Sequence, residues 1–249
     1  MNNGERTVTV NIIANDAAST TFNIALSITG IVIKIPLAFT AKNGPATIKL
    51  TSSGSPDPIS LNYSTDGGSN WNAYTLNTDI SLAENETVTF FGNNDHFSKA
   101  ISHYYRFAMT GSVEASGNIQ SLMNYSDNCP NSCYTNLFSG CTSLIKAPDM
   151  PGAILGEYSY NSMFQNCTAL TASPILPATS TVDACYMIMF QGCTSLSSIT
   201  VGLTSWNVNN SESWVEGVQT TAGTFTCPAG LPDNRGNNAI PNNWTKVNA

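Results

Sequence analysis

The chain has 249 residues, a formal net charge of −7 at pH 7, and only 10% charged residues. Because an ordinary soluble domain has about 25% charged residues, the surface of this protein must be polar but mostly uncharged. The sequence contains no Lys/Arg cluster, so it is not typical of proteins that bind nucleic acid or dock on anionic lipid.

The N-terminal sequence MNNGERTVTVNIIAND has no basic segment followed by an apolar core, so we expect no secretory signal. The most apolar stretch, Phe22 to Phe39, is broken by polar residues and by Pro36. A membrane span needs about 20 mostly apolar residues, so we expect no membrane insertion. Either an upstream signal lies outside this sequence, or the protein reaches the exterior without the secretory path. A virus-particle protein released by lysis would fit the second case.

Residues 1–36 contain alternating apolar runs, at Thr7–Ile12, Asn23–Ile28 and Ile31–Ile35. Period-two alternation is typical of half-buried strands, so we predict an extended β arm. Such an arm has open edges that another sheet must cover. We interpret it as an attachment or oligomer-forming segment; the alternative is that it simply pairs with the following domain.

Residues 37–112 are expected to form an antiparallel β-sandwich, because short strand-like runs alternate with Gly, Pro and Asn turn signals. The expected strands are Leu37–Ala41, Thr47–Thr51, Ile59–Ser64, Trp71–Leu76, Glu86–Gly92 and Tyr104–Met109.

One motif in this region, STDGGSNW from Ser64 to Trp71, resembles the Asp box of sialidases and other glycan-active proteins. Its side chains can hydrogen-bond the backbone of a turn, and its glycines permit a positive φ. Asp boxes recur several times in those enzymes, away from the catalytic centre. Here the motif occurs once, which favours a stabilised hairpin.

Residues 113–249 are organised by a pattern written three times between Cys133 and Asn210. Tyr134, Tyr160 and Tyr186 are 26 residues apart, and the same interval separates matching Phe, Cys and Leu residues. A period of about 20–29 residues with Leu and Cys/Asn anchors is the leucine-rich-repeat signature. We expect a short leucine-rich-repeat solenoid with Ser116–Met123 as a degenerate first turn and residues 211–249 as a fading fourth repeat and cap.

Two local elements are expected within each repeat. Phe138 and Cys141 are three residues apart, which predicts a short helix or 3₁₀ piece. The strand should follow at Leu144 and its counterparts and stop at Pro148 or Pro174, because proline removes a donor from the ladder. The third copy has no such proline and should have the longest strand. The fold class is therefore mainly β with short helical turns.

The seven cysteines are an odd number, so they cannot all pair within the chain. Cys133 and Cys185 share a phase but lie two repeats apart, roughly 9.6 Å at the usual strand spacing, which is too far for a disulfide. Cys141, Cys167 and Cys193 should form a ladder of buried thiols that act as small apolar side chains.

We find no motif for catalysis, for a metal or for a cofactor, so we expect a protein that is not an enzyme. Neither histidine lies near a plausible nucleophile in the sequence. Tyr158, Trp206 and Trp214 fall outside the strict repeat and are weak candidates for ligand binding, because exposed aromatic rings suit a glycan or protein contact. The competing and favoured interpretation is that these rings plug the ends of the repeats.

The segments CYMIMFQGCTSLSS and SYNSMFQNCTALTASPILPAT resemble the BspA-like leucine-rich-repeat proteins, found on gut and oral bacteria and on their phages. The closing segment from Gly223 to Trp244 resembles the usual end of that form, and the block Tyr63–Trp71 with Phe90–Asn94 resembles the β domain often found before it. The resemblance covers residues 37–249. It implies adhesion or recognition without catalysis.

The function that we favour from the sequence is a surface display and recognition module of a phage virion, as a fibre or head decoration. Its N-terminal arm would contact other virion proteins, its repeats would contact host glycan or protein, and it would form a homo-oligomer. The alternatives are a bacterial cell-surface adhesin, which would be extracellular, and a purely structural virion protein.

Overall fold

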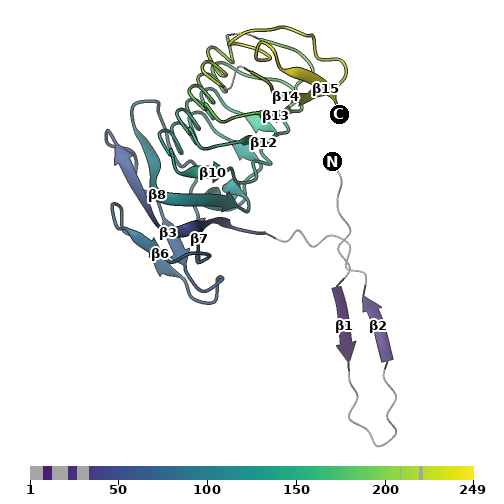
Figure 1. The fold of residues 1–249 in the computed structure, drawn as a ribbon. Helices are drawn as coiled ribbons and strands as arrows, with labels where there is room; N and C mark the ends of the chain where they lie inside the picture. Colours follow the sequence, from purple (N-terminus) through teal and green to yellow (C-terminus); the bar gives the residue numbers. More distant parts are fainter. Residues whose placement is uncertain (1–7, 13–21, 27–33, 208, 219–220) are drawn as a thin grey trace, which may run out of the picture. The chain divides into compact units, whose positions relative to one another are not determined.

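The computed structural model describes residues 8–12, 22–26, 34–207, 209–218 and 221–249 (Figure 1). The chain divides into two compact units, residues 1–34 and residues 35–249. No helix among the described residues has the length and apolar character of a membrane-crossing segment.

The first unit contains a hairpin of two strands, β1 (Val8–Ile12) and β2 (Phe22–Leu26). They pair antiparallel, with Val8 opposite Leu26. Two of the three predicted strands of the arm are thus found, paired with each other. Most of the third predicted run, at 31–33, lies outside the described residues.

The second unit begins with a mixed sheet built on two long antiparallel strands, β3 and β8. The order of the seven-stranded sheet is β10-β8-β3-β7-β4-β5, and β6 also pairs with β3. The bounds are β3 (Leu37–Ser53), β4 (Leu61–Ser64), β5 (Asn72–Ala73), β6 (Ile80–Leu82), β7 (Thr87–Gly92), β8 (Tyr104–Ser116) and β10 (Leu144–Lys146).

This arrangement corrects the expected β-sandwich and the expected boundary between residues 112 and 113. The strands of residues 37–116 form one sheet, and β8 runs through the boundary. β10, the first strand of the repeats, pairs parallel with β8. The apolar face of the sheet is covered by the repeats themselves: Phe39 and Phe107 lie 6.0 and 5.7 Å from Phe138, measured between ring centroids.

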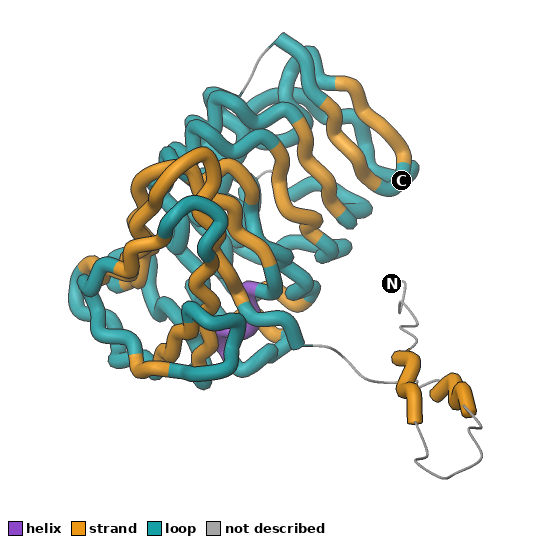
Figure 2. Tube along the Cα trace, turned by 60° about the horizontal axis from the view of Figure 1, so that its bottom comes forward, coloured by secondary structure: helices purple, strands orange, loops and turns teal. Residues whose placement is uncertain are grey.

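The remaining strands belong to the repeat region, which we define as residues 128–249. Its outer side carries a four-stranded parallel sheet in the order β12-β13-β14-β15, and a smaller parallel pair joins β11 to β9. The bounds are β9 (Asn128–Cys129), β11 (Ile154–Leu155), β12 (Ala172–Leu176), β13 (Ser198–Val201), β14 (Thr224–Cys227) and β15 (Thr245–Asn248). Turns and loops connect these short strands along the stack (Figure 2).

The prediction of a short helix in each repeat is wrong, because these segments are runs of turns. Among the described residues, one 3₁₀ helix, η1 (Ile119–Met123), is found. In the turn segments the backbone N–H groups alternate in what they bind. Leu137 donates to Tyr134, three residues back, whereas Phe138 donates to Met163 of the next repeat, at 3.2 and 2.8 Å. Because every second donor bonds the neighbouring repeat, the segment cannot close into a helix.

The turn runs need a left-handed residue at every fourth position. In the first repeat Ser132, Asn136 and Gly140 have φ values of 57°, 59° and 76°. The matching positions of the third repeat are Ala184, Ile188 and Gly192, at 47°, 59° and 73°. Glycine and asparagine tolerate this conformation, but a β-branched residue such as Ile188 is strained there.

Exchanging these side chains should therefore change stability in opposite directions. We expect Ile188→Asn to raise the free energy of unfolding by about 0.5–1 kcal/mol, since strain of about 1–2 kcal/mol is relieved while a half-buried side chain is lost. The reciprocal Asn136→Ile should lower the free energy of unfolding by about 1–2 kcal/mol. Urea unfolding of both variants gives the signs; two changes of the same sign would contradict the strain argument.

Two columns of stacked rings fill the centre of the repeat region. Tyr134, Tyr160 and Tyr186 stack at 6.0 and 6.1 Å with interplanar angles of 4° and 8°. Phe107, Phe138, Phe164 and Phe190 form the second column, at 5.7, 5.3 and 5.6 Å. The second column starts on β8, so the mixed sheet supplies the layer that covers the first repeat.

The cysteine ladder is buried as expected, and it also bonds the backbone. The thiols of Cys141, Cys167 and Cys193 donate to the carbonyls of Phe107, Phe138 and Phe164 at 3.1, 3.1 and 3.0 Å. Burial raises the pKa of Cys141 and of Cys193 to about 12, so these thiols stay protonated. All seven cysteines are free and buried.

The predicted effect of proline on the strands is wrong for the second repeat. β12 has 5 residues and includes Pro174, whereas β13 of the third repeat has 4. The register between the two strands shifts between Ala172 and Ile175. At this irregularity the backbone N–H of Thr200 donates to the Ser173 hydroxyl at 3.1 Å. A side chain thus replaces the ladder partner, and the strand continues past the proline.

Candidate functional site

Trp214, one of the three aromatic candidates, is a structural residue. Its side chain is 0% exposed, so Trp214 is not the exposed ring that a ligand contact would need. Its ring lies 6.1 Å from Tyr186 and 6.0 Å from Phe190, so it covers the end of both columns. Its indole N–H donates to the carbonyl of Ala239 at 2.8 Å.

Trp206 and Tyr158 are half-buried, and the structure does not bring them together with Trp214 as one site. Trp206 packs at 6.1 Å against Trp214 and donates to the carbonyl of Pro232 at 2.8 Å. Tyr158 occupies a left-handed turn position, with φ of 56°. Trp206 therefore has the role of a plug, whereas the contacts of Tyr158 assign it no role.

The outward side of the four-stranded parallel sheet carries aligned uncharged side chains. Ile175 lies opposite Thr200, Thr200 opposite Thr226, and Thr226 opposite Val247. A second row aligns Ala172, Ser198, Thr224 and Thr245. We call these two rows the threonine face.

The threonine face is regular; its central residues Thr200 and Thr226 are half-buried, and its edges are exposed. Ile175 and Val247 at its edges are 66% and 41% exposed. The residues between them in the chain, such as Ile199 and Phe225, are fully buried and attach the sheet to the core. Neighbouring strands lie about 4.8 Å apart, so the face presents side chains at a fixed spacing.

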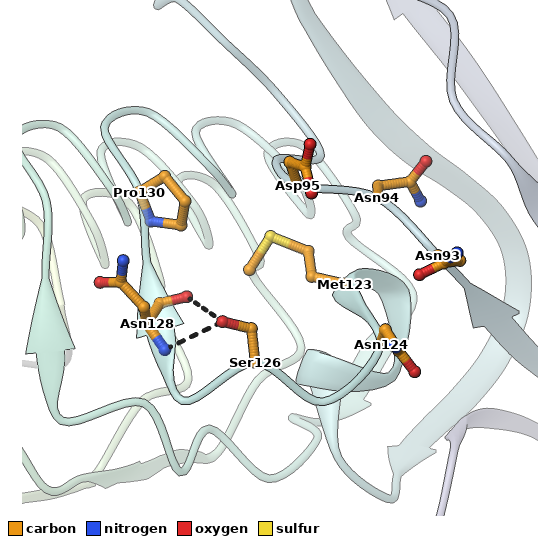
Figure 3. A pocket seen from close by; sticks show the side chains of 8 residues that line it. All are labelled: Asn93, Asn94, Asp95, Met123, Asn124, Ser126, Asn128 and Pro130. Carbon is orange, nitrogen blue, oxygen red and sulfur yellow. Dashed lines mark hydrogen bonds between the residues drawn. The ribbon is translucent and has the colours of Figure 1, made fainter.

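A pocket of about 280 Å³ lies where the mixed sheet meets the start of the repeat region, and we call it the junction pocket (Figure 3). Residues 93–95, which follow β7, line one side of it. Met123 and Asn124 at the end of η1 and the segment from Ser126 to Pro130 line the rest. In Figure 3 the Met123 side chain extends between the two sides.

Asn94 fixes the shape of this pocket. Its carboxamide accepts from the backbone N–H of Ser60 at 2.8 Å and donates to the carbonyls of Ser60 and Leu122 at 2.9 and 2.8 Å. Gly92 is needed beside it, because an added Cβ would lie 2.6 Å from both the Asn94 amide nitrogen and the Leu122 carbonyl. The Asn124 N–H also donates to the Gly92 carbonyl at 3.0 Å.

A row of partly exposed aromatic side chains adjoins the pocket in the sequence. Phe91 precedes residues 93–95, and Tyr125 follows Asn124. The centroid of the Phe91 ring lies 6.2 Å from that of Trp71 and 6.1 Å from that of Tyr125. Trp71 is 40% exposed, and the other two rings are half-buried. We call these three rings the aromatic row.

The Asp-box segment is a stabilised turn, as the sequence favoured. Asp66 accepts from the Ser64 hydroxyl at 2.7 Å and from the backbone N–H of Asn70 at 2.9 Å. The Asn70 backbone bond, followed by the Ser64 and Asn70 side chains, lowers the pKa of Asp66 to about 2. The turn delivers Trp71 to the aromatic row.

A polar cluster is buried beneath the first repeat. The Cys129 thiol lies 2.8 Å from the Tyr160 hydroxyl and 3.3 Å from the Gln120 amide nitrogen, and Tyr134 donates to Gln120 at 2.5 Å. A hydrogen bond from Cys133, with those from Tyr160 and Gln120, lowers the pKa of Cys129. Gly152 packs directly against this cluster.

The sequence did not predict the junction pocket or the aromatic row. Asn93 and Asn124 lie far apart in the chain and share no motif, and only the docking of η1 on the end of β7 brings them together. The local signal is the density of asparagine in residues 93–94 and 124–128, which is weak in a chain rich in asparagine. Among the described residues, no group of three or more His, Cys, Asp or Glu is placed to hold a metal ion.

Comparisons with known proteins give no match: the chain matches no family, and no curated protein or solved structure shows significant similarity to it.

Proposed function

We propose that this protein is a non-enzymatic display and recognition module on the outside of a phage particle, and that its repeats are of the BspA-like leucine-rich-repeat type. The arm of residues 1–36 would attach it to other virion proteins. The repeat region would face the host. The assignments to a phage particle and to this family rest on the resemblance of the repeat sequence. The observation that supports recognition is the threonine face.

The threonine face suits recognition for a physical reason. Threonine, isoleucine and valine are stiff at χ1, so they lose little side-chain entropy when a partner covers them. The strands beneath them are joined by parallel pairing from β12 to β15. The face is therefore organised before a partner arrives.

The size of the face indicates that many copies act together. Four strands spaced at about 4.8 Å span some 15 Å, which is small beside the ~800 Å² that each partner contributes to a stable interface. Display of many copies on one particle would supply avidity without new contacts. The small size of the face therefore fits a protein that is displayed in many copies on a particle surface.

The proposal predicts that charge on the threonine face weakens host binding. The test displays biotinylated protein on fluorescent streptavidin and measures binding to a panel of whole gut and oral bacterial cells. The double variant Thr200→Lys/Thr226→Lys should lose at least ten-fold in bound signal. Thr200 and Thr226 are half-buried and lie opposite each other on neighbouring strands, so each change should lower the free energy of unfolding by about 1 kcal/mol, and circular dichroism checks that the double variant is folded.

The matched control is Thr75→Lys/Thr78→Lys, which adds the same charge at exposed positions of the loop between β5 and β6. Its binding should equal that of the unchanged protein. A purely structural particle protein would bind none of the cells in any form, and that result would overturn the recognition role. Equal loss in both double variants would show a general effect of charge and would count against the threonine face.

A further inference from the structure

The junction pocket combines features that point to one class of ligand. Its accessible polar groups are carboxamides, a hydroxyl and a single carboxylate: Asn93, Asn124, Asn128, Ser126 and Asp95. Asparagine presents both donors and an acceptor on one planar group. Neighbouring hydroxyls on a sugar ring each donate and accept, so they match amide groups better than a purely donating or accepting site does.

The aromatic row supplies the complementary apolar contact. Trp71, Phe91 and Tyr125 keep part of each ring accessible. An aromatic ring is apolar on its face and packs well against apolar C–H surface. The axial C–H groups of a pyranose ring provide such a surface, while its hydroxyls point outward to polar partners. Phe91 and Tyr125 are close in the sequence to the pocket-lining residues Asn93 and Asn124, so the row and the amide-lined pocket together suit a chain of sugars.

The charges select against anionic ligands. No lysine or arginine lines the pocket, and its one charged side chain is Asp95. A phosphate, sulfate or carboxylate would meet this carboxylate without a counter-charge, and like charges held close repel. A largely apolar ligand would leave the amides desolvated and unpaired, at a cost of about 1–3 kcal/mol for each polar group. A neutral polyhydroxylated ligand meets neither penalty.

The backbone around the pocket is held in a constrained form. Asn124 and Tyr125 are consecutive left-handed residues, with φ of 50° and 58°. Asn124 tolerates this conformation as the C-cap of η1, whereas Tyr125 is strained there by about 1–3 kcal/mol, and such strain gathers at functional sites. Here the two residues turn the chain sharply after η1, so that Asn124 reaches the pocket and Tyr125 reaches Phe91. Asn94 holds the opposite wall with its three hydrogen bonds.

We propose that the junction pocket and the aromatic row together bind a neutral oligosaccharide, with one sugar ring in the pocket and its neighbours along the row. A volume of about 280 Å³ lies just below the usual range for drug-sized ligands, roughly 300–1,000 Å³, which fits a single ring. The proposal rests on the recognition function above and names a ligand class for it, at a surface separate from the threonine face.

The test is a glycan array probed with the streptavidin-displayed full chain, with neutral oligosaccharides beside sialylated and sulfated ones. We expect binding to a subset of neutral glycans. Asn93→Ala/Asn124→Gly should weaken it at least ten-fold; glycine at 124 removes the amide while keeping the left-handed backbone. Trp71→Ala should weaken it to a similar extent. Circular dichroism establishes that each variant is folded.

Two controls make the outcome decisive. Thr75→Ala, exposed in the loop between β5 and β6, should bind as the unchanged protein does. The threonine-face variant Thr200→Lys/Thr226→Lys should keep its glycan binding. Any one of three results would overturn the proposal: the protein binds no neutral glycan, it binds only anionic glycans, or the pocket variants bind as the unchanged protein does. If the threonine-face variant still lost at least ten-fold in cell binding in that case, the recognition function would stand while the sugar site would fall.

Discussion

Replacing Trp214 with alanine should lower the free energy of unfolding by about 3–5 kcal/mol, the usual cost of removing a buried tryptophan. The effect should lie at the upper end because the ring closes two columns at once, against Tyr186 and Phe190. Its loss would leave both columns open and the Ala239 carbonyl without its indole donor. Urea unfolding monitored by circular dichroism measures the change.

The control for this prediction is Trp71→Ala, which removes an equal volume from a side chain that is 40% exposed. It should change the free energy of unfolding by no more than about 1 kcal/mol, as is typical of surface substitutions. Trp214→Phe should recover part of the loss by keeping a ring at the column ends. Equal effects of Trp214→Ala and Trp71→Ala would contradict the capping role.

Replacing Gly152 with alanine should be nearly as damaging, although it adds a single methyl group. An added Cβ would lie 2.5 Å from the Cys129 sulfur, 2.8 Å from the Tyr160 hydroxyl and 2.9 Å from the Gln120 amide nitrogen. Overpacking costs about 1–3 kcal/mol, and a buried polar group that loses its partner costs about 1–3 kcal/mol more. We expect a total of about 3 kcal/mol in urea unfolding.

Gly140→Ala is the matched control, because no atom lies within 4 Å of a Cβ added there. Its φ of 76° makes alanine strained, so the expected cost is about 1 kcal/mol. A double-mutant cycle sharpens the test: Cys129→Ala removes the closest clashing atom, so Gly152→Ala should cost at least 1 kcal/mol less in that background. Strict additivity would show that the clash is not with Cys129.

The two surfaces with proposed roles differ in how far they follow from sequence. The threonine face could be anticipated in outline, since the repeat places equivalent residues on the same side of each strand. Its composition depends on register, and the shift at Pro174 sets which residue of β12 meets Thr200. The junction pocket could not be anticipated, because it depends on how η1 meets the end of β7.

The sequence by itself determined the period, the position of the columns and the burial of the cysteine ladder. These follow because matching residues recur every 26 positions, and a repeat that stacks must place matching side chains above one another. Tyr134, Phe138 and Cys141 could be assigned to the core without coordinates for that reason. The Asp-box turn also followed from a local pattern.

Only the tertiary structure decided how the repeats begin and end. Apolar alternation in residues 37–112 predicts that one face of the sheet is buried, but it does not identify what covers that face. A second sheet was expected there, whereas the repeats cover the face. The turn runs were mistaken for helix because their spacing is the same, whereas the donors of alternate residues go to the next repeat. From sequence alone, Trp214 could lie either on the surface or at the end of the repeats. Its burial depends on two columns of rings that meet at one side chain, and this is a property of the whole stack rather than of any single repeat.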